Sequence, residues 1–351
     1  MNSRPTSHGG VLLILLLVFS IVILSGLAFL IQSAAANYGT VRAKERSWQA
    51  RLWAESAIED AAARLLADPY WRAYGSDTSR ILSEELPEGA RYEARVTETH
   101  APDRLVVEAT GFSEGARFSV QQEVRLRMPF LFTLLAVKDI RLAGNAVVEG
   151  NADAGGEMTV FDQARITASA RAGKSFNGAK ENVSGGVTEG ISADGSFDFA
   201  KVFAAVLLEK PRRIMGGGLT NMAMADTSIW IDGSADARGI LIRGGCILVA
   251  GDLRIRGPFE VEGLKNRVAL IVDGDLTIEE GGSLRATGPV VVRDAFTSFG
   301  RCVIQGSVFA KSIDAGAGFY LRADPELARA AIPGFSRTVK LGRYCEASSD
   351  P

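Results

Sequence analysis

"HGGVLLILLLVFSIVILSG", residues 8–26, is the stretch that decides how the rest of the chain is interpreted. It opens an uncharged run of 21 residues, from Val11 to Ile31, dominated by leucine, isoleucine, valine and phenylalanine. As a helix that rises about 1.5 Å per residue, this run spans a hydrocarbon core of about 30 Å. The apolar region of a cleavable secretory signal is shorter, at about 7–15 residues. The stretch therefore predicts a transmembrane segment over residues 11–32.

The composition narrows the function class. The formal net charge is −2 over 351 residues. Binding nucleic acid would need a strongly basic surface, so we expect no nucleic-acid partner. The chain has only two histidines, His8 and His100, and these are far apart. Histidine-rich metal sites and most histidine-dependent catalytic arrangements are therefore nearly excluded. Glycine is frequent after residue 140, which indicates tight turns between short strands.

The ten residues before the apolar run, "MNSRPTSHGG", are polar, weakly basic and end in glycine. In this the sequence resembles the type IV pilin and pseudopilin superfamily, and within it the PilX-type minor pilins. The resemblance implies a leader of residues 1–10, cut by a prepilin peptidase between Gly10 and Val11. At the fifth mature position, where major pilins carry glutamate, this chain has Leu15. That departure argues against a bulk filament subunit. An uncleaved signal-anchor is the alternative.

Residues 33–69 continue the apolar run as an expected amphipathic stalk helix. Good helix formers dominate "SAAANYGTVRAKERSWQARLWAESAIEDAAARLLAD", and Pro69 ends the run. Apolar residues recur mostly at spacings of three, four or seven: Val41, Trp48, Leu52, Ile58, Ala62, Leu65 and Leu66. Gly39 is a candidate flexible point. A rod that is half apolar and half amphipathic has the shape of a pilin stalk, although a plain spacer helix has the same pattern.

Residues 70–128 are expected to form a small pilin-like β region. "ARYEARVTE", "RLVVEATGFSEG" and "ARFSVQQEVRLRM" alternate in the strand period between turn signals, which indicates a small antiparallel sheet. A pilin head would place such a sheet against its helix.

A repeat appears after Pro129. "ILVAGDLRIRG", "LIVDGDLTIEEG", "VVVRDAFTSFG" and "SVFAKSIDAGAG" align on Gly251, Gly274, Asp294 and Lys311 at spacings of 23, 20 and 17 residues, and "LLAVKDIRLAG" (134–144) is similar. The pattern predicts a right-handed β-solenoid (β-helix) over residues 129–325, with Leu253, Ile255, Leu276 and Ile278 inside it. A sandwich with irregular loops is the alternative.

Three further segments of the glycine-rich half have predicted structures. Residues 145–228 are glycine-rich and are expected to hold a loop and helix insertion, with a short amphipathic helix in "FDFAKVFAAVLLEKPRR" (197–213). "YLRADPEL" (320–327) is expected to terminate the stack, and it resembles the close of solenoids fused to PilX-type stalks. Residues 326–351 are expected to be a C-terminal tail.

The candidate chemical sites are few. Asp252, Asp273 and Asp275 recur at coil turns, where aspartate commonly bonds its own backbone, so we expect no catalytic, cofactor or metal residue and no cofactor. A structural calcium ion or an acid pair of a solenoid glycosidase is the alternative at these turns. Outside the cytoplasm, Cys302 and Cys345 are a candidate disulfide, with Cys246 as a buried thiol.

Together these patterns predict an α+β structural protein rather than an enzyme. We expect a single-pass inner-membrane protein with most of its chain periplasmic, acting as a minor-pilin-like component of a type IV pilus or related secretion filament. The partners implied are a prepilin peptidase, other pilin or pseudopilin subunits and inner-membrane lipid. Two alternatives stay open: a membrane-anchored, bactofilin-like polymer-forming scaffold, and a surface carbohydrate-active solenoid enzyme.

Overall fold

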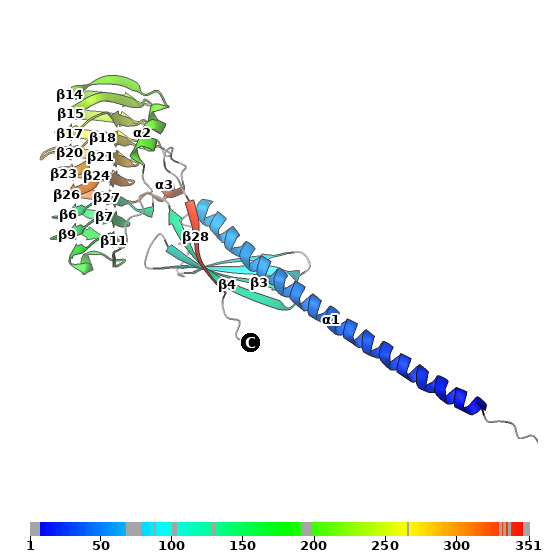
Figure 1. Cartoon of the computed structure of the whole chain (residues 1–351). Helices are drawn as coiled ribbons and strands as arrows, with labels where there is room; N and C mark the ends of the chain where they lie inside the picture. Colours follow the sequence, from blue (N-terminus) through cyan, green and yellow to red (C-terminus); the bar gives the residue numbers. More distant parts are fainter. Residues whose placement is uncertain are drawn as a thin grey trace, which may run out of the picture.

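The structure is a computed structural model, and it describes residues 8–67, 79–86, 89–99, 104–127, 131–190, 198–264, 267–329, 332, 335 and 338–346. It has three parts: a long helix, a five-stranded antiparallel sheet packed on the carboxyl half of that helix, and a β-solenoid beyond the sheet (Figure 1). The fold is therefore α+β with a solenoid, as the sequence predicts.

Helix α1, His8–Ala67, is one unbroken helix of 60 residues. At about 1.5 Å per residue it is about 90 Å long. It passes through Gly39 without interruption, so the expected flexible point does not break the helix. The last three residues of the predicted leader, His8–Gly10, already belong to the helix, while residues 1–7 lie outside the described residues.

The sheet beside α1 has the strand order β1-β2-β3-β4-β28, and every neighbouring pair is antiparallel. Its strands are β1 (Ser79–Glu85), β2 (Arg91–Glu98), β3 (Arg104–Ser113), β4 (Ala116–Arg127) and β28 (Thr338–Glu346). The expectation of a C-terminal tail over 326–351 is therefore wrong for residues 338–346. They return from the solenoid and add a strand along β4, with Leu341 opposite Val124. The solenoid is thus an insertion between two adjacent strands of one sheet.

Small residues let the helix and the sheet approach closely. Ala50, Ala54, Ala57 and Ala61 follow one another at helical spacings of three and four and are fully buried. Gly111 of β3 lies directly against them. A Cβ at that position would meet the carbonyl oxygen of Ala50 and would lie 2.6 Å from the amide nitrogen of Ala54. The backbones are therefore in contact at this crossing, which leaves no room for a larger residue.

The buried face of α1 differs from the predicted one. Ile58 and Leu65 are buried as expected, but Val41 and Trp48 are each 63% exposed, and Leu52 and Leu66 are also exposed. The prediction followed the large apolar side chains. The sheet selects the small ones instead, because only alanine allows the close approach at Gly111.

The solenoid is a continuous sheet of 23 strands in about ten coils, with parallel pairing throughout. Its strands before the crossover are β5 (Leu134–Ala136), β6 (Ile140–Leu142), β7 (Val147–Glu149), β8 (Ala152–Ala154), β9 (Met158–Val160), β10 (Arg165–Ile166), β11 (Ala170–Ala172), β12 (Phe176–Gly178) and β13 (Val187–Glu189), with the 3-10 turn η4 (Lys180–Asn182) between the last two. After helix α2 (Phe199–Leu207) come β14 (Arg212–Ala225), β15 (Ile229–Arg243), β16 (Ile247–Val249), β17 (Leu253–Ile255), β18 (Pro258–Glu262), β19 (Leu270–Val272), β20 (Leu276–Ile278), β21 (Ser283–Thr287), β22 (Val290–Val292), β23 (Ala295–Ser298), β24 (Arg301–Gln305), β25 (Val308–Ala310), β26 (Ser312–Ala315), β27 (Phe319–Arg322) and the short helix α3 (Pro325–Arg329).

The predicted repeats stack as coils. Ile247 pairs with Leu270 and Leu270 with Val290, which reproduces the spacings of 23 and 20 residues, while Val290 pairs with Val308, 18 residues on. The four predicted interior side chains, Leu253, Ile255, Leu276 and Ile278, are all fully buried. The solenoid prediction is confirmed, and the sandwich alternative is not the fold.

The coils do not stack in chain order from one end to the other. The first coil, β5–β7, lies between the second coil and the last, because Leu134 pairs with both Ala152 and Val308. The chain enters the stack in its middle, fills one half as far as β13, crosses to the opposite end and returns through β14 to β27 (Figure 1). "YLRADPEL" therefore does not terminate the stack: Tyr320 and Leu321 in β27 pair with Val147 and Val148 in β7.

The predicted insertion at 145–228 is mostly regular coil. Residues 147–189 form seven short strands, β7 to β13, whose interior positions mix alanine, such as Ala152 and Ala170, with larger residues such as Met158. Strands of two or three residues, with alanine at many interior positions, leave almost no hydrophobic period, which is why the sequence reads as loop. The predicted helix is present as α2, although shorter than predicted, with Asp198 accepting a hydrogen bond from the backbone N–H of Lys201 at 3.3 Å.

Helix α2 and the segment after β27 cover one outer face of the solenoid. Val202 and Val206 of α2 belong to one apolar cluster with Leu248 and Ile271, which point away from the solenoid interior. Nearer the sheet, the Phe309 ring lies 5.3 Å from that of Phe335. These residues share one apolar cluster with the helix–sheet interface, so the solenoid and the small sheet are packed as one body.

The helix–sheet contact gives a first prediction. Replacing Gly111 with alanine inserts a methyl group where the α1 backbone lies, so the helix must shift, and we expect a loss of about 1–3 kcal/mol in the free energy of unfolding. The measurement is denaturant unfolding of the detergent-solubilised chain. Gly218→Ala is the matched control, since a Cβ there meets nothing within 4 Å. Equal stability of the two variants would contradict the packing described.

Candidate functional site

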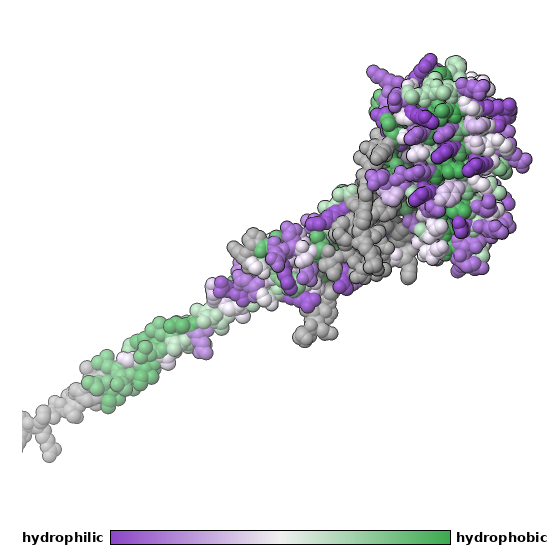
Figure 2. All heavy atoms as spheres, turned by 180° about the vertical axis from the view of Figure 1, so that it is seen from behind, coloured by the Kyte–Doolittle hydropathy of each residue, from purple (hydrophilic) through white to green (hydrophobic). Residues whose placement is uncertain are grey.

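The amino-terminal half of α1 exposes an apolar surface on all sides (Figure 2). Between Leu13 and Ile31 the large apolar side chains are 47% to 72% exposed, and no described residue covers them. In the part of the chain that the structure describes, α1 is the one helix long and apolar enough to span a membrane. An apolar surface of this extent needs another apolar environment, such as lipid or the same surface on a neighbouring chain.

The two predicted processing residues lie in the first turns of α1. Gly10 and Val11 are both helical, and the apolar surface begins immediately after them. The side chain of Leu15 is 64% exposed on that surface. Glycine is a poor helix former, so Gly9 and Gly10 make this end of α1 its most easily unwound part.

Polar contacts fix the sheet on the carboxyl half of α1. The Arg46 guanidinium forms an ion pair with Glu114 at 2.6 Å, and Ser113 donates a hydrogen bond to Gln49 at 2.9 Å. Together these contacts hold the β3–β4 turn to the middle of the helix. Nearer its carboxyl end, the Tyr92 hydroxyl lies 2.6 Å from Glu84 and 3.1 Å from Asp60. Burial, reinforced by these two carboxylates, raises the pKa of Tyr92 above its ordinary value, so the ring stays neutral.

The recurring carboxylates of the solenoid bond the backbone of the adjacent coil. Asp252 accepts from the N–H of Asp275 at 3.0 Å, and Asp275 accepts from the N–H of Ala295 at 2.9 Å. Asp273 forms an ion pair with Arg293 at 2.6 Å. Among the described residues, no group of three or more histidine, cysteine, aspartate or glutamate side chains is arranged to hold a metal ion. The aspartates therefore act as links between coils.

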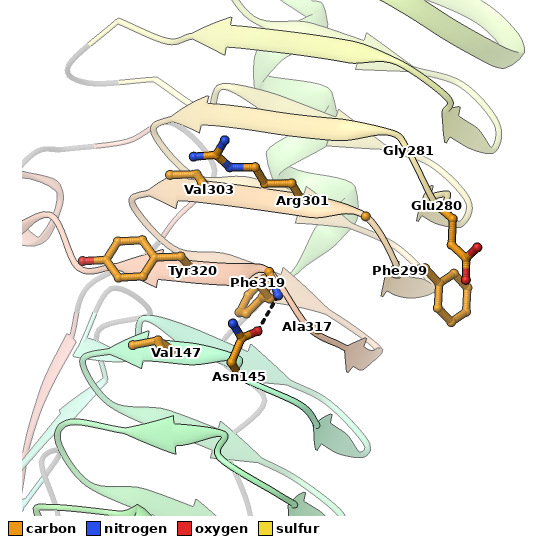
Figure 3. A pocket seen from close by; sticks show the side chains of 12 residues that line it. Asn145, Val147, Glu280, Gly281, Phe299, Arg301, Val303, Ala317, Phe319 and Tyr320 are labelled. Carbon is orange, nitrogen blue, oxygen red and sulfur yellow. Dashed lines mark hydrogen bonds between the residues drawn. The ribbon is translucent and has the colours of Figure 1, made fainter.

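An open groove crosses the outer face of the solenoid at the ends of strands β24, β27 and β7 (Figure 3). Its volume is about 920 Å³. Phe299 lies beside Glu280 at one end, Tyr320 lies at the other, and Asn145 lies between them. A smaller hollow of about 390 Å³ shares Arg301 and Val303 with it and continues toward β18. We call the larger hollow the aromatic groove; it is lined by Asn145, Val147, Glu280, Gly281, Phe299, Gly300, Arg301, Val303, Ala317, Gly318, Phe319 and Tyr320.

Sequence reasoning missed this groove. Phe299 follows an alternating strand in "FTSFG", at a position where the turn of the coil calls for a polar residue. It is 60% exposed, although a buried phenylalanine, Phe296, lies only three residues earlier. An aromatic residue in a coil turn was the available signal. Most of the groove lies on consecutive coils between Glu280 and Tyr320, and the stacking of the first coil on the last adds Asn145 and Val147.

The predicted disulfide is absent. Cys302 is fully buried inside the solenoid in β24, whereas Cys345 is exposed in β28 of the small sheet, and all three cysteines are free thiols. The prediction failed because it took residues 326–351 for a tail reaching back to the solenoid. Burial raises the pKa of both the Cys246 and the Cys302 thiols far above the ordinary value.

No family model matches the chain, and no curated protein matches it. Solved structures similar to it include the competence-associated pilin ComZ from Thermus thermophilus, at 12% identity over 86% of this chain and 97% of that one, with a TM-score of 0.33. An ice-binding protein from the Antarctic ascomycete Antarctomyces psychrotrophicus is 14% identical over 57% and 98%, with a TM-score of 0.37. An ice-binding DUF3494 domain from Shewanella frigidimarina is 12% identical over 56% and 95%, with a TM-score of 0.28. At TM-scores this low, the likenesses carry no argument about what this chain does.

The cysteine environments give a second prediction. Treating the folded chain with iodoacetamide at about pH 8 is expected to alkylate Cys345 and to leave Cys246 and Cys302 unmodified, because the thiolate is the nucleophile and the two buried thiols stay protonated. Mass spectrometry of tryptic peptides measures the labelling, and unfolding in guanidinium before treatment is the control in which all three react. A Cys302–Cys345 peptide pair in the unreduced digest would show that the structure places β28 wrongly.

Proposed function

We propose that the chain is a minor-pilin-like component of a type IV pilus or related secretion filament, acting in filament assembly or initiation or in adhesive display. The observation that carries the proposal is the division of one unbroken helix, α1, into two functional halves. Its amino-terminal half offers apolar side chains on every side, while Ala50, Ala54, Ala57 and Ala61 in the other half hold the antiparallel sheet. A solitary anchor needs no such rigid continuation.

In this proposal α1 has two successive environments. Before assembly its apolar half lies in the inner membrane, with most of the chain on the periplasmic side. After assembly the same half packs against the corresponding helices of other pilin subunits, exchanging lipid contacts for protein contacts. Because Leu15 stands where major pilins carry glutamate, the chain joins through apolar packing and lacks that charged contact. This favours an occasional or initiating subunit over a bulk subunit.

The solenoid would be the displayed part. It lies at the far end of α1 from the apolar half, and the shared apolar cluster fixes it to the small sheet (Figures 1 and 2). We propose no catalytic role and no cofactor for it, since Asp252 and Asp275 accept backbone hydrogen bonds from the neighbouring coil. Stacked coils with hydrogen bonds between them form a stiff support for a binding surface.

Two of the similar solved structures are ice-binding proteins, but ice binding is not proposed for this chain. The face that runs from β15 through β17, β20, β23, β26 and β6 to β9 has two threonines in register at its centre, Thr277 and Thr297. Charged side chains flank them on both sides: Asp236 and Arg254 toward β15, and Asp314 and Arg141 toward β9. Charged groups hold their hydration water strongly, which disfavours docking on an uncharged crystal surface.

Processing of the leader gives a third prediction. When the chain is co-expressed with a prepilin peptidase, we expect a mature protein that begins at Val11, and we expect Gly10→Ala to abolish cleavage. The mature mass and amino-terminal peptide are measured by mass spectrometry. Gly9→Ala is the matched control, since it makes the same chemical change one residue away and should leave cleavage intact. An uncut leader in the unaltered chain would reject the pilin proposal and leave a membrane-anchored solenoid scaffold.

A further inference from the structure

We propose that the aromatic groove binds a neutral polysaccharide chain laid across the coils of the solenoid. The inference rests on the proposed display role, since it names the class of ligand that the displayed part would hold. Its chemistry is nonetheless independent of the leader, of the membrane and of any other subunit.

Two partly exposed aromatic side chains line the groove: Phe299 in a coil turn and Tyr320 on β27. Phe299 is 60% exposed in a coil turn, so the face of its ring is open to a ligand. Tyr320 is half-buried on β27, which restricts the motion of its ring. Sugar rings present faces of C–H groups that stack on aromatic rings, and a pre-positioned ring costs little entropy on binding.

Polar groups between the two rings match hydroxyl groups. Asn145 accepts a hydrogen bond from the N–H of Gly318 at 2.8 Å, which fixes its amide beside the groove (Figure 3). Arg301 supplies donors and Glu280 supplies acceptors, and both are exposed. A sugar hydroxyl both donates and accepts, so it can use all three kinds of group at once.

The charge of the lining favours a neutral ligand. Glu280 and Arg301 are the charged residues that line the groove, and they have opposite signs. In the adjoining hollow, Glu260 and Arg285 likewise oppose each other, in register on neighbouring strands. A polyanion would meet two carboxylates and no net positive charge, so nucleic acid and acidic glycans are disfavoured.

The dimensions favour a chain over a single sugar. The groove and the adjoining hollow together cross β18, β21, β24, β27 and β7, which are consecutive neighbours in the stack. Four intervals of about 4.8 Å make this path about 19 Å long. One interval is close to the advance of one sugar in an extended polysaccharide, so successive coils can contact successive sugars.

The test uses the purified full-length chain in detergent and isothermal titration calorimetry with cellohexaose, xylohexaose, chitohexaose and maltohexaose. An alginate hexasaccharide is the acidic comparison. We expect at least one neutral hexasaccharide to bind and the acidic one to bind more weakly. Absence of binding by all four neutral probes, or tighter binding of the alginate, would overturn the proposal.

Matched variants place the binding in the groove. Phe299→Ala is expected to weaken the affinity about tenfold, because it removes the stacking surface without touching the core. Phe161→Ala removes another exposed phenylalanine of the solenoid, which is 45% exposed and lies outside the groove, and should leave the affinity unchanged. Thermal unfolding checks that both variants are folded. Equal affinity in the two variants would overturn the groove proposal. If the chain binds the sugar but its leader stays uncut by the prepilin peptidase, the groove proposal stands and only the filament role is rejected.

Discussion

The architecture depends on the pairing of the first coil of the solenoid with its last. Leu134 lies beside Val308, and Glu149 lies beside Arg322, so the chain leaves the stack next to where it entered. The insertion can therefore begin after β4 and end before β28, two strands that pair with each other. A stack built in chain order would place entry and exit at opposite ends, about nine strand intervals or 40 Å apart. Such ends could not both join adjacent strands of one sheet without long connections.

The second constraint is the close contact between Gly111 and α1, which fixes the sheet on the helix. Alanines on α1 let the sheet lie directly on the helix backbone, so β3 can shift little relative to α1. The apolar cluster that contains Leu65 and Val107 continues to Val291 and Phe309 on the solenoid. Helix, sheet and solenoid therefore share one apolar cluster, and a force on the solenoid passes through this cluster to the helix.

The parts predictable from sequence are those with long apolar side chains at a regular period. The apolar run of α1 and the coils around Leu253 and Leu276 have that signal, and both predictions are confirmed. The coils at 152–178 show it only weakly, because alanines such as Ala152 and Ala170 take many of the interior positions and the strands are two or three residues long. The buried face of α1 was also misassigned. Which of its residues are buried depends on the contact with Gly111, which is far away in the chain. Strand β28 was missed because its identity depends on β4, and nothing local to "TVKLGRYCE" shows that pairing.

The order of the coils also has a consequence for how the chain folds. One edge of the first coil, β5–β7, stays unpaired until β25–β27 have been synthesised. Almost the whole insertion separates these two coils in sequence. During synthesis the first coils can therefore form only a half-stack with an unpaired edge at β5–β7, open to pairing with other chains. Contacts between residues so distant in sequence form slowly, because the conformational entropy of the intervening chain must be lost first. The joining of the two half-stacks is thus the expected slow step, and the sheet can gain its fifth strand only after that step is complete.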